Sequence, residues 1–124
     1  MSVTLIVAIV CMFSALALYT TGVWSERLAG RLIPRHVLFF WAGLLFDTTG
    51  TTLMGRLAGR MDLDFHGITG ALAIAFMLGH AVWASVVLLL KQERVLVNFH
   101  KFSLVVWLLW LIPFVSGLLG AMLK

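Results

Sequence analysis

Four histidines are the residues of this sequence best suited to chemistry: His36, His66, His80 and His100. Each lies within or at the end of a long apolar stretch, where an ionisable side chain is costly and is a functional candidate. An imidazole in such a place can link two helices by a hydrogen bond, carry a proton or bind a metal. A purely structural role accounts equally well for any single one, but the four together favour a binding site.

His66 and His80 share one apolar stretch and are 14 residues apart. On a helix this spacing places them within roughly 40° of the same face and about 21 Å apart along the axis. Histidine is a common axial ligand of haem iron. A planar macrocycle that crosses a helix needs a small residue there, and Gly70 lies between the two histidines. The spacing is therefore compatible with one or two haem b groups stacked along a helix bundle.

A second possible pair of haem ligands follows from the depth of the histidines along their helices. His36 comes two residues after Pro34 and His100 two residues after Asn98, at the starts of two apolar stretches. An upright haem between two helices takes ligands at similar height, so His36 with His100 is the tidiest pair if the second and fourth apolar stretches face each other across the bundle. His80 is the main competitor, about 15 Å from the end of its own stretch. An error of two to four residues in the helix ends would pair His80 with either of them.

Asp47 is the one acidic residue near the middle of an apolar stretch, roughly 20 Å along the helix from Pro34. We expect its carboxyl group to be protonated or hydrogen-bonded, because a buried charge is expensive. Four threonines surround it and could pair with it or bond to their own helix, the latter being the favoured interpretation: Thr48, Thr49, Thr51 and Thr52. A proton relay through Asp47 is the minority hypothesis. Trp83 follows His80 by three positions, so it could flank a bound macrocycle.

The elements that must position these residues are membrane-spanning helices. With 62% hydrophobic residues, 11% charged residues and a mean hydropathy of +1.08, the chain cannot form a water-soluble surface, since a soluble domain has about 25% charged residues. A span needs about 20 apolar residues. The sequence predicts an all-α protein, an integral membrane four-helix bundle in one domain covering 1–124, with spans at about 3–23, 34–58, 65–90 and 98–123.

The net charge of +4 is explained by topology and not by nucleic-acid binding, because the basic residues flank the spans. The first and third connections and their flanks hold six: Arg27, Arg31, Arg35, Lys91, Arg94 and Lys101. The opposite side holds three: Arg56, Arg60 and Lys124. The positive-inside rule then predicts that the N- and C-termini are outside and that His36 and His100 are near the cytoplasm.

Four segments give the sequence a resemblance to a known family. They are Gly-Val-Trp-Ser-Glu at 22–26, Phe-Asp-Thr-Thr-Gly-Thr-Thr at 46–52, Phe-His-Gly-Ile-Thr-Gly at 65–70 and Asn-Phe-His-Lys-Phe-Ser at 98–103. The chain resembles the HsmA family of small bacterial haem-sequestering membrane proteins over nearly its whole length. The resemblance implies a four-span protein that binds haem in the cytoplasmic membrane and protects against haem toxicity, with histidines of these motifs as ligands.

The His66 to His80 spacing is also similar to one helix of membrane b-type cytochromes, although no second histidine stands near the level of His66. The sequence thus favours haem sequestration without enzymatic activity, and the alternative is electron transfer between quinol and an acceptor. No hydrolytic, transferase or phosphate-binding motif is visible. A channel or transporter is disfavoured because four spans without an inverted repeat offer little lining. The expected partners are haem and the lipid bilayer, with quinol for the alternative, and a homo-oligomer is compatible with the sequence.

Overall fold

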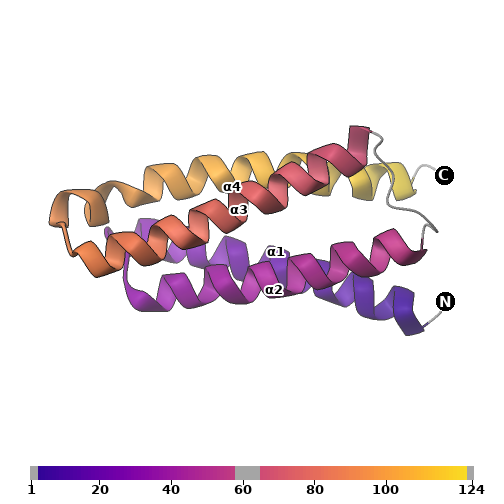
Figure 1. The fold of residues 1–124 in the computed structure, drawn as a ribbon, viewed down its shortest axis with the longest axis horizontal. Helices are drawn as coiled ribbons and strands as arrows, with labels where there is room; N and C mark the ends of the chain where they lie inside the picture. The colour runs from indigo at the N-terminus through magenta and orange to yellow at the C-terminus, as the bar shows by residue number, and fades with distance from the viewer. Residues whose placement is uncertain (1–2, 58–64, 123–124) are drawn as a thin grey trace.

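Four antiparallel helices form the protein, as the computed structural model of the chain shows (Figure 1). They are α1 (Val3–Ala29), α2 (Pro34–Leu57), α3 (Phe65–Leu90) and α4 (Glu93–Met122). The structure describes the backbone of residues 3–57 and 65–122, and the side chains of residues 3–54 and 70–116. Each of the four helices is long and apolar enough to cross a membrane. The predicted all-α, four-helix fold is confirmed.

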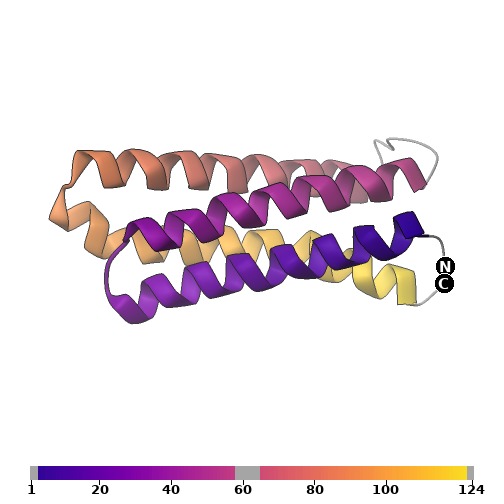
Figure 2. The ribbon, with the colours of Figure 1, turned by 90° about the horizontal axis from the view of Figure 1, so that it is seen from below.

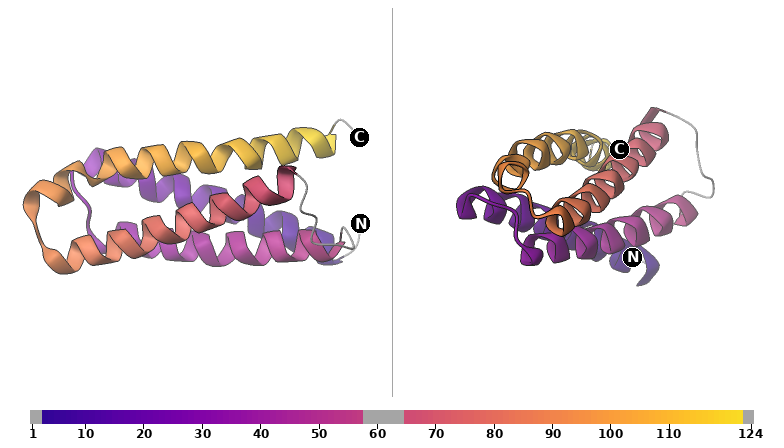
Figure 3. Two further views of the ribbon diagram at one scale, coloured as in Figure 1. Left: turned by 45° about the horizontal axis from the view of Figure 1, so that its top comes forward. Right: turned by 60° about the vertical axis from the view of Figure 1, so that its left-hand side comes forward.

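The helices pack in chain order around the bundle, and α4 closes the ring against α1. Figure 2, seen from below, shows the start of α1 and the end of α4 at one end of the bundle. The connections between α1 and α2 and between α3 and α4 both lie at the other end (Figure 3). There the amide of Leu32 donates a hydrogen bond to the carbonyl of Leu96, with an N···O distance of 3.1 Å. We call this the connection end of the bundle.

Apolar side chains cover the outside of the bundle, whereas several polar side chains lie inside it. Leu28, Leu89 and Phe76 are among many large exposed hydrophobic residues, an arrangement suited to contact with lipid tails. Two buried apolar clusters fill the interior. One surrounds Phe40 toward the connection end, and the other surrounds Tyr19 and Met77 farther along the bundle.

Glycines let α1 and α2 approach closely. A Cβ atom added to Gly43 would lie 2.5 Å from two ring carbons of Tyr19, and one added to Gly50 would lie 2.7 Å from the sulfur of Met12. Real Cβ atoms do not come so near to other atoms, so side chains of α1 occupy the space that a larger residue on α2 would need. Small residues at helix interfaces allow such close packing in membrane bundles.

Two helix ends differ from the sequence-based prediction. α1 continues to Ala29, six residues past the predicted end at 23, and α4 begins at Glu93, five residues before 98. Glu26 lies beyond the predicted span end at 23, yet it is fully buried in the bundle. α1 instead stops at Gly30, whose φ of 78° is the left-handed conformation that often ends helices.

Candidate functional site

Five polar or charged side chains are buried among the described residues: Glu26, His36, Asp47, His80 and Ser103. A polar group inside an apolar bundle is costly unless it is hydrogen-bonded. The hydrogen bonds separate these five side chains into a chain of three, a single histidine and a network around Asp47. Each arrangement implies a different role.

His80, Ser103 and Glu26 form a hydrogen-bonded chain across three helices. His80 Nε2 on α3 is 2.8 Å from Ser103 Oγ on α4. The Ser103 hydroxyl group donates to Glu26 Oε1 on α1 over 2.7 Å. All three side chains are 0% exposed. Ser103 therefore links the imidazole of His80 to the carboxylate of Glu26 inside the bundle. His80 lies about 15 Å along α3 from the end of that helix.

Aromatic rings surround His80. Its ring centroid is 4.4 Å from that of Phe40 on α2, and 5.4 Å and 5.7 Å from those of Phe99 and Phe102 on α4. These phenylalanines pack around the imidazole, which is 0% exposed. His80 is thus a fully buried ring with three aromatic neighbours.

Three buried side-chain atoms have no hydrogen-bond partner within the described part of the chain: His80 Nδ1, Glu26 Oε2 and His36 Nε2. Leaving such an atom unpaired in a protein interior costs about 1–3 kcal/mol. Native structures carry few of them, and they are often found where a ligand, ion or water binds. Two of the three belong to the His80 chain, which makes that chain the strongest candidate site.

His36 has a local role at the start of α2. Its Nδ1 accepts a hydrogen bond from the backbone N–H of Ile33 over 3.2 Å. This bond resembles the one in a capping box, in which a side chain in the first turn reaches back to the residue before the helix. His36 therefore has a purely structural role of the kind that the sequence allowed for any single histidine. With Nδ1 accepting, the proton of a neutral His36 ring is on Nε2.

His100 is only partly buried, and its Nδ1 lies 3.0 Å from the carbonyl oxygen of Val97 in its own helix. Because a carbonyl oxygen can only accept, Nδ1 donates, and a neutral ring then has its free electron pair on Nε2. This tautomer suits a ligand. However, the position of His100 is roughly 100° around α4 from Phe99, which contacts His80. The predicted pairing of His36 with His100 remains a prediction.

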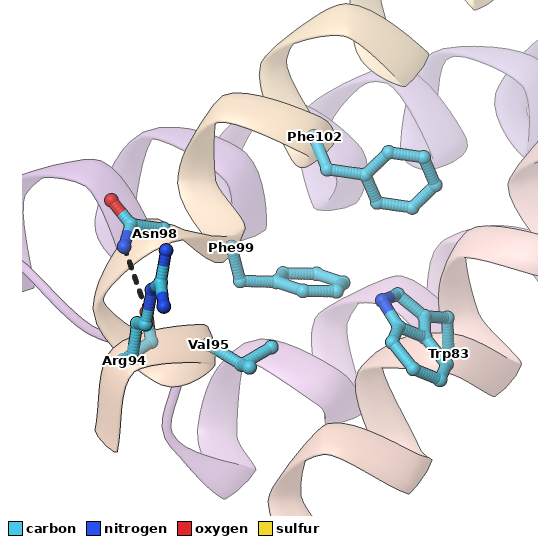
Figure 4. Close-up of a pocket in the computed structure, with 6 residues that line it drawn as sticks. All are labelled: Trp83, Arg94, Val95, Asn98, Phe99 and Phe102. Atoms are coloured by element: carbon cyan, nitrogen blue, oxygen red, sulfur yellow. Dashed lines mark hydrogen bonds between the residues drawn. The ribbon is translucent and has the colours of Figure 1, made fainter. Parts of the chain in front are cut away.

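A pocket opens beside His80 between α3 and α4 (Figure 4). It encloses about 370 Å³ and is lined by Trp83, Arg94, Val95, Asn98, Phe99 and Phe102. Figure 4 shows the rings of Trp83, Phe99 and Phe102 gathered at one side and Arg94 with Asn98 at the other. Phe99 and Phe102 line the pocket and also contact His80, which is fully buried and does not itself line the pocket. The pocket suits a flat apolar molecule that carries an anionic group.

Three further residues were predicted to belong to the site: Gly70, His66 and Trp83. A Cβ atom added to Gly70 would meet nothing within 4 Å, so there is open space beside this glycine. Gly70 is ten residues from His80, about 15 Å along α3. The side chain of His66 lies outside the described residues. Trp83, predicted to flank a macrocycle, lines the pocket next to His80.

Asp47 is the centre of a separate network. Its Oδ2 accepts hydrogen bonds from the hydroxyl of Tyr19 at 3.1 Å and from Trp110 Nε1 at 2.9 Å. Its Oδ1 accepts a hydrogen bond from Thr51 at 3.4 Å. The prediction that Asp47 is hydrogen-bonded is confirmed. Both of its carboxylate oxygens are satisfied, which indicates that Asp47 joins helices and is not a binding site.

Glu26 and Ser103 are the site residues that sequence reasoning missed. A signal was present in their spacing. Glu26 is seven residues after Tyr19 on the buried side of α1, and Ser103 lies four residues after Phe99 and seven before Trp110 on the buried side of α4. Residues separated by seven positions share a helix face. Their polar character masked this pattern, because an acid next to Arg27 is typical of a helix end in water.

Among the described residues, no group of three or more His, Cys, Asp or Glu side chains could hold a metal ion. A haem needs fewer protein ligands, because the porphyrin supplies four ligands and the protein only one or two. Comparison with protein-family models, curated proteins and solved structures finds no match. The function must therefore be inferred from the residues of this chain.

Proposed function

We propose that this chain is a multi-pass protein of the bacterial cytoplasmic membrane that binds haem b through His80 and thereby sequesters it. One observation carries the proposal. His80 is a fully buried imidazole with one nitrogen bonded to Ser103, the other nitrogen without a partner, and an aromatic pocket beside it. Metal-binding histidines usually have such a hydrogen bond on the nitrogen that does not bind the metal.

The residues around His80 fit a haem group in their chemistry. The unpartnered nitrogen of His80 would bind the iron, and the rings of Trp83, Phe99 and Phe102 would pack on the macrocycle. Arg94 carries a positive charge at the polar side of the pocket, where it would pair with a propionate group. Because His80 is fully buried and does not line the pocket, a macrocycle that reaches it must displace some of the side chains around it.

Sequestration requires only that the site hold haem and shield it. The aromatic surroundings of His80 serve this purpose, because a haem enclosed in an apolar site is kept from water and from soluble reactants. Electron transfer across the bilayer would require a second haem near the far end of the bundle. Such a haem would have to use His66, at the start of α3, and no other histidine among the described side chains lies at that end of the bundle to pair with it. A single site at the connection end is all that sequestration requires.

Haem occupancy of purified single variants tests the ligand assignment. We expect His80→Ala to lose most of its haem by pyridine haemochrome assay, because the iron–nitrogen bond is lost. His36→Ala should lose stability through the α2 cap and retain haem, and Trp110→Ala is a control for a deep aromatic residue. Full occupancy in His80→Ala would refute His80 as the ligand, and full occupancy after removal of all four histidines would refute histidine ligation.

Haem tolerance of cells tests the function. Sequestration is a mass-action effect, so protection against added haem should increase with protein level and saturate when bound haem equals the available sites. A His80→Ala variant that inserts normally into the membrane should give no protection against added haem. An electron-transfer protein would instead be reduced by quinol, and its loss would slow respiration without added haem. If quinol reduces the haem of the protein and the cells gain no haem tolerance at any expression level, sequestration is wrong. The electron-transfer alternative then takes its place.

A further inference from the structure

The hydrogen bonds of Ser103 determine which nitrogen of His80 carries a proton. A serine hydroxyl group has a single hydrogen. That hydrogen is donated to Glu26 Oε1, at 2.7 Å. In the other bond, at 2.8 Å, Ser103 Oγ must then accept, so His80 Nε2 must donate. In a neutral His80 ring the free electron pair is consequently on Nδ1, which is the buried nitrogen without a partner.

We propose that Ser103 and Glu26 are positioning residues that fix the tautomer and orientation of His80 and transmit the negative charge of a carboxylate to it. This inference rests on the proposed function, in which His80 binds the iron. Hydrogen-bond partners of this kind make a ligating histidine more basic and hold its ring direction. A more basic ligand stabilises ferric over ferrous iron, so the two residues would keep the bound haem oxidised.

The geometry of the chain supports a specific role over simple packing. Its three members come from α3, α4 and α1, and each is 0% exposed. Glu26 has one oxygen bonded to Ser103 and the other without a partner. If Glu26 served only to join helices, more complete hydrogen bonding would be expected, as at Asp47, whose two oxygens accept three bonds.

Three substitutions separate the effect of the charge from the effect of the hydrogen bond. Glu26→Gln keeps the size of the side chain and an acceptor oxygen for Ser103 but removes the charge. Ser103→Ala removes the link itself, and Ser103→Thr retains a hydroxyl group. Matched controls are Glu93→Gln, at an exposed ion pair with Arg31, and Ser85→Ala, which removes a hydroxyl group that donates to the Ala81 carbonyl and accepts from Trp41 Nε1 on α2.

In haem-loaded protein, we expect Glu26→Gln to bind haem but to show a raised midpoint potential and an altered ferric electron paramagnetic resonance spectrum. Ser103→Ala should bind haem about 10–100-fold more weakly, and Ser103→Thr should recover most of that affinity. A merely structural role would change thermal stability and leave the potential and the spectrum unchanged. The two control variants should match the wild type in haem affinity, midpoint potential and spectrum.

Two outcomes would overturn the inference, and they are distinguishable. If His80→Ala loses haem while the Glu26 and Ser103 variants match their controls in affinity, potential and spectrum, the positioning role is wrong and the proposed ligand stands. If His80→Ala retains haem, the ligand assignment in the proposed function is wrong, and the inference fails with it.

Discussion

At the residue scale, the threonines around Asp47 have two different roles. Thr51 donates to Asp47, whereas Thr49 and Thr52 donate to carbonyl oxygens of their own helix. Proximity in sequence predicted these local bonds. Tyr19 and Trp110, the two other donors to Asp47, come from 28 positions before it and 63 positions after it. Such partners depend on helix packing, which a single sequence does not reveal.

Replacing Asp47 with Ala should destabilise the bundle. The hydroxyl group of Tyr19 and the indole N–H of Trp110 would be left buried without an acceptor, at a cost of about 1–3 kcal/mol for each group. Thermal unfolding in detergent measures the effect. Thr49→Val is the control, because it removes only an exposed bond within one helix. Equal stability of the two variants would show that the Asp47 network does not hold the helices together.

The same limit applies to the candidate site. The sequence predicted that histidines in apolar stretches would be important, and it included His80 among them. It did not separate His80 from His36 and His100, because their positions on the helices are similar in kind. The three histidines differ in their hydrogen-bond partners. His80 bonds to Ser103, His36 to the N–H of Ile33, and His100 to the carbonyl of Val97.

At the element scale, the apolar pattern predicted the start of α2 and both ends of α3, because proline and charged residues mark them. The helix α1 runs six residues past the predicted span end at 23. Within those residues, the carboxyl group of Glu26 accepts a hydrogen bond from Ser103 inside the bundle. A rule based on hydropathy assigns polar residues to water, so it does not predict a buried polar contact of this kind.

Two glycines inside helices should respond oppositely to the same substitution. In Gly43→Ala the new methyl group would lie 2.5 Å from ring carbons of Tyr19. Such overpacking typically costs about 1–3 kcal/mol, and displacement of Tyr19 would also weaken its bond to Asp47. In Gly79→Ala the methyl group would meet nothing within 4 Å, and alanine is the better helix former.

Thermal unfolding of both variants in detergent tests this contrast. Gly43→Ala should unfold at a lower temperature than the wild type, and Gly79→Ala at the same or a slightly higher temperature. If both variants lose stability equally, the close approach of α1 and α2 at Gly43 is not a determinant of the fold.

At the scale of the whole molecule, the structure brings two basic connections together. The segments around Arg31 and Lys91 lie at the connection end, where Arg31 donates to Glu93 Oε1 at 2.7 Å. This ion pair is exposed, so it adds little stability. Sequence alone predicted that the two connections share a side of the membrane, since an even number of spans separates them. The remaining question is which side of the membrane that end faces.

The distribution of Lys and Arg predicts that the connection end faces the cytoplasm. The test places single cysteines in a Cys11→Ala background, because Cys11 is the only native thiol and is buried. In intact cells, a cysteine at Ala29 should be shielded from an impermeant thiol reagent, and one at position 61, between α2 and α3, should be labelled. Both should react after the membrane is permeabilised. The reverse pattern would place the connection end outside, and the pocket at Arg94 would then receive haem from the exterior of the cell instead of the cytosol.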